Sequence, residues 1–162
     1  MQRVISKWRS TREGKPIRLI VIHGDAGKSD AGTVDWITNK KHTAGVSYHY
    51  LVGRDGEVYQ FVDEAEKAWH AGISSWEDCT HNKSVNAYSV GVSFANDGKA
   101  EQYRPVQYEA GAKLVAQIMA RHGIPLQQVV GHADVSPGRK SDPWKTFDWS
   151  HFRELLSQRG VA

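Results

Sequence analysis

Two short apolar segments restrict this chain to folds built around a buried sheet. IRLIVIHG (residues 17–24) is rich in apolar and β-branched residues and ends in His23 and a glycine. NAYSVGVSFAND (86–97) contains a second such run, followed by an Asn-Asp-Gly turn. Short apolar runs bounded by turn residues predict buried strands. His23 is therefore expected at the carboxyl end of a strand.

The remaining pattern alternates between strands and helices. VSYHYLVGRDGEVYQFV (46–62) holds two β-rich runs joined by Arg-Asp-Gly, and Asp-Gly between such runs is a strong hairpin signal. A short strand, or an extended entry into the following loop, is predicted over 127–132, with His132 at its end. Helical patterns occupy three segments: 33–41, 105–122, where a proline begins the helix and Gly123 stops it, and 149–160, where Asp148 is the expected cap.

These elements predict the α/β class, with a central mixed β-sheet flanked by α-helices. A length of 162 residues suits a single domain over residues 1–162. Residues 1–16 form a basic N-terminal extension of that domain. We interpret its charge either as a solvated face or as attraction to an anionic polymer.

Composition excludes several classes of protein. The net charge is only +3, and we find no nucleic-acid-binding motif. No apolar run approaches the roughly 18 residues of a membrane span. The first ten residues lack the apolar segment of a signal peptide, so we expect synthesis in the cytoplasm. Cys79 is the only cysteine, which excludes an internal disulfide, and we interpret it as structural.

A metal site is suggested by three side chains from distant segments. His23 and His132 follow predicted strands, and Asp142 lies in the turn-rich segment GHADVSPGRKSDPW (131–144). Two imidazoles and one carboxylate are a common ligand set for catalytic zinc, because they leave a fourth position open. Spacing alone leaves structural roles for the histidines open.

Five motifs occur in an order that resembles a known family. They are VIHGDAG, VSYHYLVGRDGEVYQFV, AWHAG, NAYSVGVSF and GHADVSPGRKSDPW, and they extend over about residues 17–150. Together they resemble the zinc-dependent N-acetylmuramoyl-L-alanine amidases of the second amidase family. That family includes phage lysins, cytosolic anhydromuropeptide amidases and animal peptidoglycan recognition proteins.

The resemblance implies roles for particular residues. It implies zinc (Zn2+) held by His23, His132 and Asp142, with Tyr48 and Lys140 as catalytic residues. Lys140 stands two residues before Asp142, so in an extended segment both side chains point the same way. We expect four further residues to contact substrate: Trp69, His70, Asn86 and Arg139.

One position departs from the family pattern. Several members carry a glutamate, regarded as the base, where this chain has Ser93 in SVGVSF. Two alternatives follow: Tyr48 and Lys140 perform the proton transfer, or activity is weakened. We favour the first, because both residues are present.

The leading hypothesis is a monomeric hydrolase that cuts peptidoglycan between the lactyl group of N-acetylmuramic acid and L-alanine. We interpret it as a phage-type endolysin, a bacteriolytic and antimicrobial enzyme that acts on the host cell wall in the periplasm and is released with the help of a holin. One alternative is a non-catalytic peptidoglycan-binding module. The other is a cytosolic recycling amidase, ranked lower because those relatives usually keep the glutamate.

Overall fold

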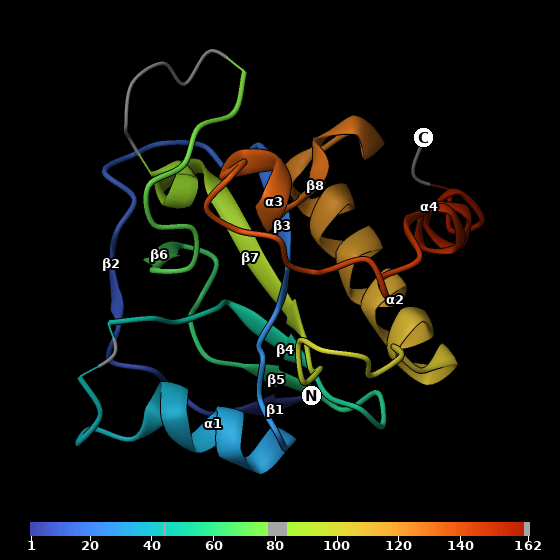
Figure 1. Cartoon of the computed structure of the whole chain (residues 1–162). Helices are drawn as coiled ribbons and strands as arrows, with labels where there is room; N and C mark the ends of the chain where they lie inside the picture. Colours follow the sequence, from blue (N-terminus) through green and yellow to red (C-terminus); the bar gives the residue numbers. More distant parts are fainter. Residues whose placement is uncertain (44, 78–83, 161–162) are drawn as a thin grey trace.

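A computed structural model of the chain describes residues 1–43, 45–77 and 84–160 (Figure 1). Cys79 lies outside these ranges. The strands are β1 (Gln2–Arg3), β2 (Arg9–Thr11), β3 (Leu19–Gly24), β4 (Tyr50–Val52), β5 (Val58–Gln60), β6 (Glu66–Ala68), β7 (Ser89–Phe94) and β8 (Val129–Gly131). The α-helices are α1 (Asp30–Thr38), α2 (Pro105–His122), α3 (His132–Val135) and α4 (Trp149–Ser157), and the 3₁₀ turns are η1 (Val85–Tyr88) and η2 (Leu126–Gln128).

Six strands form a mixed sheet in the order β1-β5-β4-β7-β3-β8, and β2 pairs with β6 in a smaller sheet. In the centre, β3 pairs in parallel with both β7 and β8. The predicted hairpin is confirmed: β4 and β5 are antiparallel, and Gly56 in their turn has φ 78°. Figure 1 shows helices flanking the sheet: α2 and α4 lie next to each other, and α1 lies well apart from them. The predicted architecture is therefore confirmed.

The two faces of the sheet differ in chemistry because side chains alternate along each strand. On one face, β3 and β7 bury aliphatic and aromatic side chains against α2 and α4. Burying each such side chain stabilises the fold by roughly 1.5–3 kcal/mol. On the other face, β7 presents only Ser89, Gly91 and Ser93, beside His23 of β3. These small residues leave room for polar rings above the sheet.

The helix ends follow capping chemistry. Helix α2 has the predicted bounds, and Gly123 ends it in a left-handed conformation with φ 64°. Helix α1 begins and ends three residues before the predicted 33–41 segment, because the Ser29 side chain accepts from Gly32 N and Asn39 is already extended. Asp148 caps α4 as predicted, although α4 ends at Ser157.

The N-terminal segment 1–16 is integrated into the domain. Strand β1 pairs with β5 at the edge of the main sheet, and β2 pairs with β6. Arg12 is 5% exposed and donates to the carbonyl oxygens of Glu64, Asn86, Ala87 and Ser89. Burial lowers its pKa to about 10, so it stays charged at neutral pH. Within the described ranges, no helix combines the length and apolarity needed to cross a bilayer.

The buried guanidinium predicts a large stability effect. Arg12→Ala leaves buried carbonyl oxygens without donors, each of which costs about 1–3 kcal/mol. We expect the free energy of unfolding to fall by about 3–5 kcal/mol, measured by urea denaturation. The control is Arg3→Ala, which removes an exposed ion pair with Asp63 and should change stability by about 0–1 kcal/mol. Equal effects from both variants would contradict this role for Arg12.

Candidate metal centre

Strand register brings the two predicted histidine ligands together. Ile22 pairs with Gly131 in the parallel β3–β8 ladder, so the next residues, His23 and His132, are neighbours at the carboxyl ends of both strands. The sequence placed His132 at the end of a strand, which is wrong by one residue: β8 ends at Gly131, and His132 begins the short helix α3. Loops and helix starts at this edge are where open α/β sheets place ligands.

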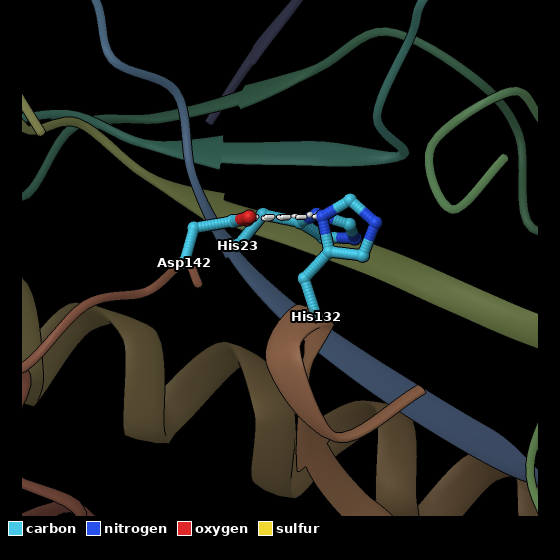
Figure 2. A group of neighbouring side chains, drawn as sticks. All are labelled: His23, His132 and Asp142. Carbon is cyan, nitrogen blue, oxygen red and sulfur yellow. Dashed lines mark hydrogen bonds and ion pairs between the residues drawn. The ribbon is translucent and has the colours of Figure 1, made fainter. Parts of the chain in front are cut away.

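Asp142 completes the group from the loop after α3. Its carbonyl oxygen accepts from Ala133 N at 3.0 Å, which ties the loop back to α3. Its Oδ2 accepts from Gly24 N at 3.3 Å, which ties its side chain to the end of β3. Figure 2 shows the Asp142 carboxylate and the two imidazoles pointing toward one another.

Three donor atoms converge in this cluster. His23 Nδ1 and His132 Nδ1 are 3.1 Å apart, His132 Nδ1 is 3.0 Å from Asp142 Oδ1, and His23 Nδ1 is 3.3 Å from Asp142 Oδ2. A tetrahedral zinc ion with ligands at 2.0–2.2 Å separates its donor atoms by about 3.3–3.6 Å. The separations of 3.0–3.3 Å observed here lie within a few tenths of an ångström of that range, so the three residues fit such an ion and leave one ligand position open.

The charges of the cluster also favour a cation. Burial lowers the pKa of His23 to about 4, so this ring is neutral at pH 7. Burial alone would raise the pKa of Asp142, but its contacts with His132 and His23 outweigh burial and hold that pKa well below its usual range. His132 Nε2 lies 3.2 Å from the carbonyl oxygen of Ala71, an acceptor that can hold the ring proton when a cation replaces the hydrogen bond between His132 Nδ1 and Asp142. An ionised carboxylate facing a lone pair is stabilised by a metal ion between them.

A groove with a volume of ≈ 480 Å³ carries both predicted catalytic residues, Tyr48 and Lys140. The Tyr48 ring lies 5.2 Å from the His23 ring. Burial raises the pKa of the Tyr48 hydroxyl, which therefore stays protonated at neutral pH. Lys140 is exposed, and its charge contributes to the lowered pKa of His23, which places it within electrostatic range of the centre.

The four expected substrate contacts occupy different surroundings. His70 is 5% exposed and lies behind His23, with its Nδ1 2.9 Å from His23 Nε2. Asn86 Oδ1 accepts from the backbone nitrogens of His70 and Ala71. His70 thus supports the ligand His23, and Asn86 holds the backbone of His70. None of the four residues lines the groove that holds Tyr48 and Lys140.

Trp69 and Arg139 lie nearer the surface. Trp69 donates from Nε1 to Ser10 Oγ, and its ring lies 5.6 Å from that of Trp8. Arg139 is exposed but donates to the carbonyl oxygens of Ala71 and Ile73. Its guanidinium therefore holds the segment 71–73, in which the carbonyl of Ala71 also accepts the hydrogen bond from His132 Nε2.

Three residues that line the groove were not predicted from the sequence: Asp25, Lys28 and Trp36. Asp25 follows His23 by two residues, and this spacing was an available signal. Its carboxylate accepts from Thr33 Oγ1 and from Asn96 N, so it joins α1 and the loop after β7 to the groove. Trp36 is 50% exposed, and a tryptophan among the polar residues of the predicted helix 33–41 was a second signal.

Fold and site together define a single-domain α/β protein with a buried two-histidine, one-carboxylate ligand set beside an open groove. The profile of a family described as N-acetylmuramoyl-L-alanine amidase matches residues 13–145. The chain therefore belongs to the N-acetylmuramoyl-L-alanine amidase family.

Relatives within this family are similar over most of the chain. The N-acetylmuramoyl-L-alanine amidase AmiD of Escherichia coli K12 is 34% identical over 161 residues, which covers 90% of this chain and 54% of AmiD. The 1,6-anhydro-N-acetylmuramyl-L-alanine amidase AmpD of Citrobacter freundii is 34% identical over 112 residues, which covers 69% of this chain and 58% of AmpD. This chain thus spans little more than half the length of these two relatives. A crystal structure of a selenomethionine AmpD derivative superimposes with a TM-score of 0.83 at 27% identity and covers 96% of this chain and 93% of that chain.

The geometry predicts one metal ion per chain. Asp142→Asn keeps the shape of the side chain but removes the charge that balances a cation, so zinc affinity should fall by at least about 100-fold. Chelator competition measures this affinity. The control is Asp148→Asn, because Asp148 is an exposed helix cap and asparagine caps equally well. Unchanged affinity in the Asp142 variant would remove this residue from the ligand set.

Proposed function

We propose that this chain is a zinc-dependent amidase that hydrolyses the bond between the lactyl group of N-acetylmuramic acid and L-alanine in muramyl peptides. The observation that carries the proposal is the convergence of His23, His132 and Asp142 at spacings that suit tetrahedral zinc, beside a groove that holds Tyr48 and Lys140. Family membership supports the substrate class, because AmiD and AmpD are both named as amidases of this bond.

The chemistry that zinc would supply at this centre is polarisation of the amide carbonyl and acidification of a water molecule, to a pKa of about 7. The protein's own side chains would then stabilise the charge that develops. Lys140 lines the groove as an exposed cation, and it would hold the amide oxygen as that oxygen becomes negative. A donor placed in this way contributes about 10²–10³-fold to the rate in other hydrolases.

Tyr48 would act as a hydrogen-bond donor. Its raised pKa keeps the hydroxyl protonated at neutral pH, so Tyr48 would donate a hydrogen bond to an oxygen of the substrate or of the attacking water without giving up its proton. Ser93 lies on the same face of the sheet as His23 and is fully buried, and its Oγ meets hydrogen-bond geometry with no described residue. Ser93 nevertheless lies close enough to Tyr48 to lower the pKa of that hydroxyl. We infer that Ser93 and Tyr48 together orient the attacking water where other family members use glutamate.

The form of the substrate separates three hypotheses. A recycling amidase acts on soluble 1,6-anhydromuropeptides, and the name of AmpD supports this form. An endolysin, which the sequence favoured, acts on intact sacculi of the host and depends on a holin for release. A non-catalytic binding module cleaves neither substrate. We propose soluble anhydromuropeptides as the first substrate to test, because the relatives at 34% identity include a 1,6-anhydro-specific name.

The proposal predicts chelator-sensitive cleavage. Incubation with an anhydromuramyl tripeptide should release a peptide with a free L-alanine amine, detected by mass spectrometry. A chelator should abolish release, and added zinc should restore it. Parallel incubation with stripped sacculi distinguishes the hypotheses: clearing of sacculi without soluble turnover favours the endolysin. Binding to sacculi without any cleavage, in the zinc-loaded protein, would overturn the amidase proposal.

Lys140→Ala should lower kcat by about 10²–10³-fold while zinc affinity stays within about twofold of wild type, because Lys140 is a groove cation and not a ligand. Lys145→Ala is the matched control, since Lys145 is an exposed lysine of the same loop outside the groove. Steady-state kinetics and chelator competition check both values. If the Lys140 variant lost zinc, or kept the wild-type kcat, its proposed role would be wrong.

A further inference from the structure

We propose that Ser89, Gly91 and His70 form a positioning relay that fixes His23 in the one tautomer able to bind the metal. The relay deepens the proposed function and rests on it for the identity of the ion. None of the three residues reaches the metal donor cluster itself: they act through His23.

The direction of each hydrogen bond in the relay follows from its end at Ser89, whose partner is a backbone carbonyl. Ser89 Oγ lies 2.8 Å from the carbonyl oxygen of Val85, which can only accept, so the single hydroxyl proton of Ser89 is used there. His70 Nε2 lies 3.0 Å from the same Ser89 Oγ. Because Ser89 has no second proton to give, His70 Nε2 must carry the hydrogen and donate it.

The order then passes from His70 to His23. His70 is buried and its two ring nitrogens face Ser89 Oγ and His23 Nε2, neither of which is negatively charged, so its ring carries one proton, at Nε2, and a lone pair at Nδ1. His23 Nε2 lies 2.9 Å from that lone pair and must therefore donate. A His23 ring with its one proton at Nε2 turns the lone pair of Nδ1 toward His132 and Asp142. The Ser89 hydroxyl thus determines, through His70, that His23 Nδ1 is unprotonated and able to bind the metal.

The position of the His70 ring depends on a missing side chain. A Cβ at position 91 would come within 2.6 Å of His70 Cγ and 2.8 Å of its Nδ1, which is closer than real Cβ atoms approach. The ring therefore rests on the bare backbone of β7, two residues from Ser89 on the same face. Asn86 Oδ1 holds the backbone nitrogen of His70 at 3.3 Å. Three separate contacts therefore fix His70: its ring packs on Gly91, its backbone nitrogen donates to Asn86, and its Nε2 donates to Ser89.

The relay differs from the support of the second histidine. His132 donates from Nε2 to the backbone carbonyl of Ala71, an acceptor that cannot change its role. The acceptor for His23 is an imidazole, which can exchange donor and acceptor nitrogens unless something locks it. Ser89 supplies that lock. The metal affinity should therefore depend on a serine that touches neither metal nor substrate.

Ser89→Ala tests the relay with little change in volume. Losing the hydroxyl frees His70 to adopt the other tautomer, so His23 Nδ1 carries a proton part of the time, and zinc affinity should fall by about 10-fold. The matched control is Ser6→Ala, because Ser6 is also fully buried and donates at 2.8 Å to a carbonyl, that of Ile37, in the N-terminal segment. Chelator competition measures both. Equal zinc affinities in the two variants would overturn the proposal.

A spectroscopic readout identifies the tautomer directly. Nitrogen-15 shifts of the imidazole rings in metal-free protein should show His23 and His70 each protonated at Nε2, and Ser89→Ala should give mixed populations for both. A His23 ring protonated at Nδ1 in the wild type would overturn the relay. In the His70→Leu background, Ser89→Ala should cause no further loss of zinc affinity, because the relay is already broken. A full additional loss there would show that Ser89 acts by another route.

These measurements use no substrate, so they separate the two proposals. Cleavage of muramyl peptides with zinc affinity that is insensitive to Ser89 refutes the relay alone. Ser89-dependent zinc binding in a protein that cleaves no muramyl peptide refutes the proposed function alone.

Discussion

The structure depends on bringing two imidazole nitrogens and a carboxylate oxygen within 3.0–3.3 Å of one another in a buried place. Groups that all carry lone pairs repel unless a proton or a cation lies between them. Each contact around the cluster holds one of these groups against that repulsion: a carbonyl behind His132, an imidazole behind His23, and a backbone nitrogen on Asp142. The fold supplies the ligand geometry before any ion binds, which lowers the ordering cost of binding.

The central strand β7 makes this arrangement possible. Its residues alternate between large apolar side chains, which pack against α2 and α4, and Ser89, Gly91 and Ser93, which face the polar rings. One strand therefore stabilises the core and clears space for the site. A larger residue at position 91 would displace the His70 ring, so a change of one methyl group on the strand would be transmitted to the metal centre.

Local chemistry determined which features could be predicted from sequence. Helix α2 has the predicted bounds because a proline and a left-handed glycine mark its ends. Helix α1 was displaced because the Ser29 cap was overlooked. The ligand set could be proposed only with the help of a family resemblance, since 109 positions separate His23 from His132 and only strand register brings them together. The support given by His70 could not be predicted, because it depends on proton order through Ser89. A glycine inside the apolar strand 86–97 was the available hint, since such glycines mark close approach of another group.

X-ray absorption spectroscopy of the zinc-loaded protein tests the central claim most directly, because it reports the atoms that surround the ion. The account predicts one zinc per chain with only nitrogen and oxygen neighbours at about 2.0–2.2 Å, including scattering from two imidazole rings. A sulfur neighbour at about 2.3 Å, which would implicate Cys79, or the signature of a single imidazole, would contradict it.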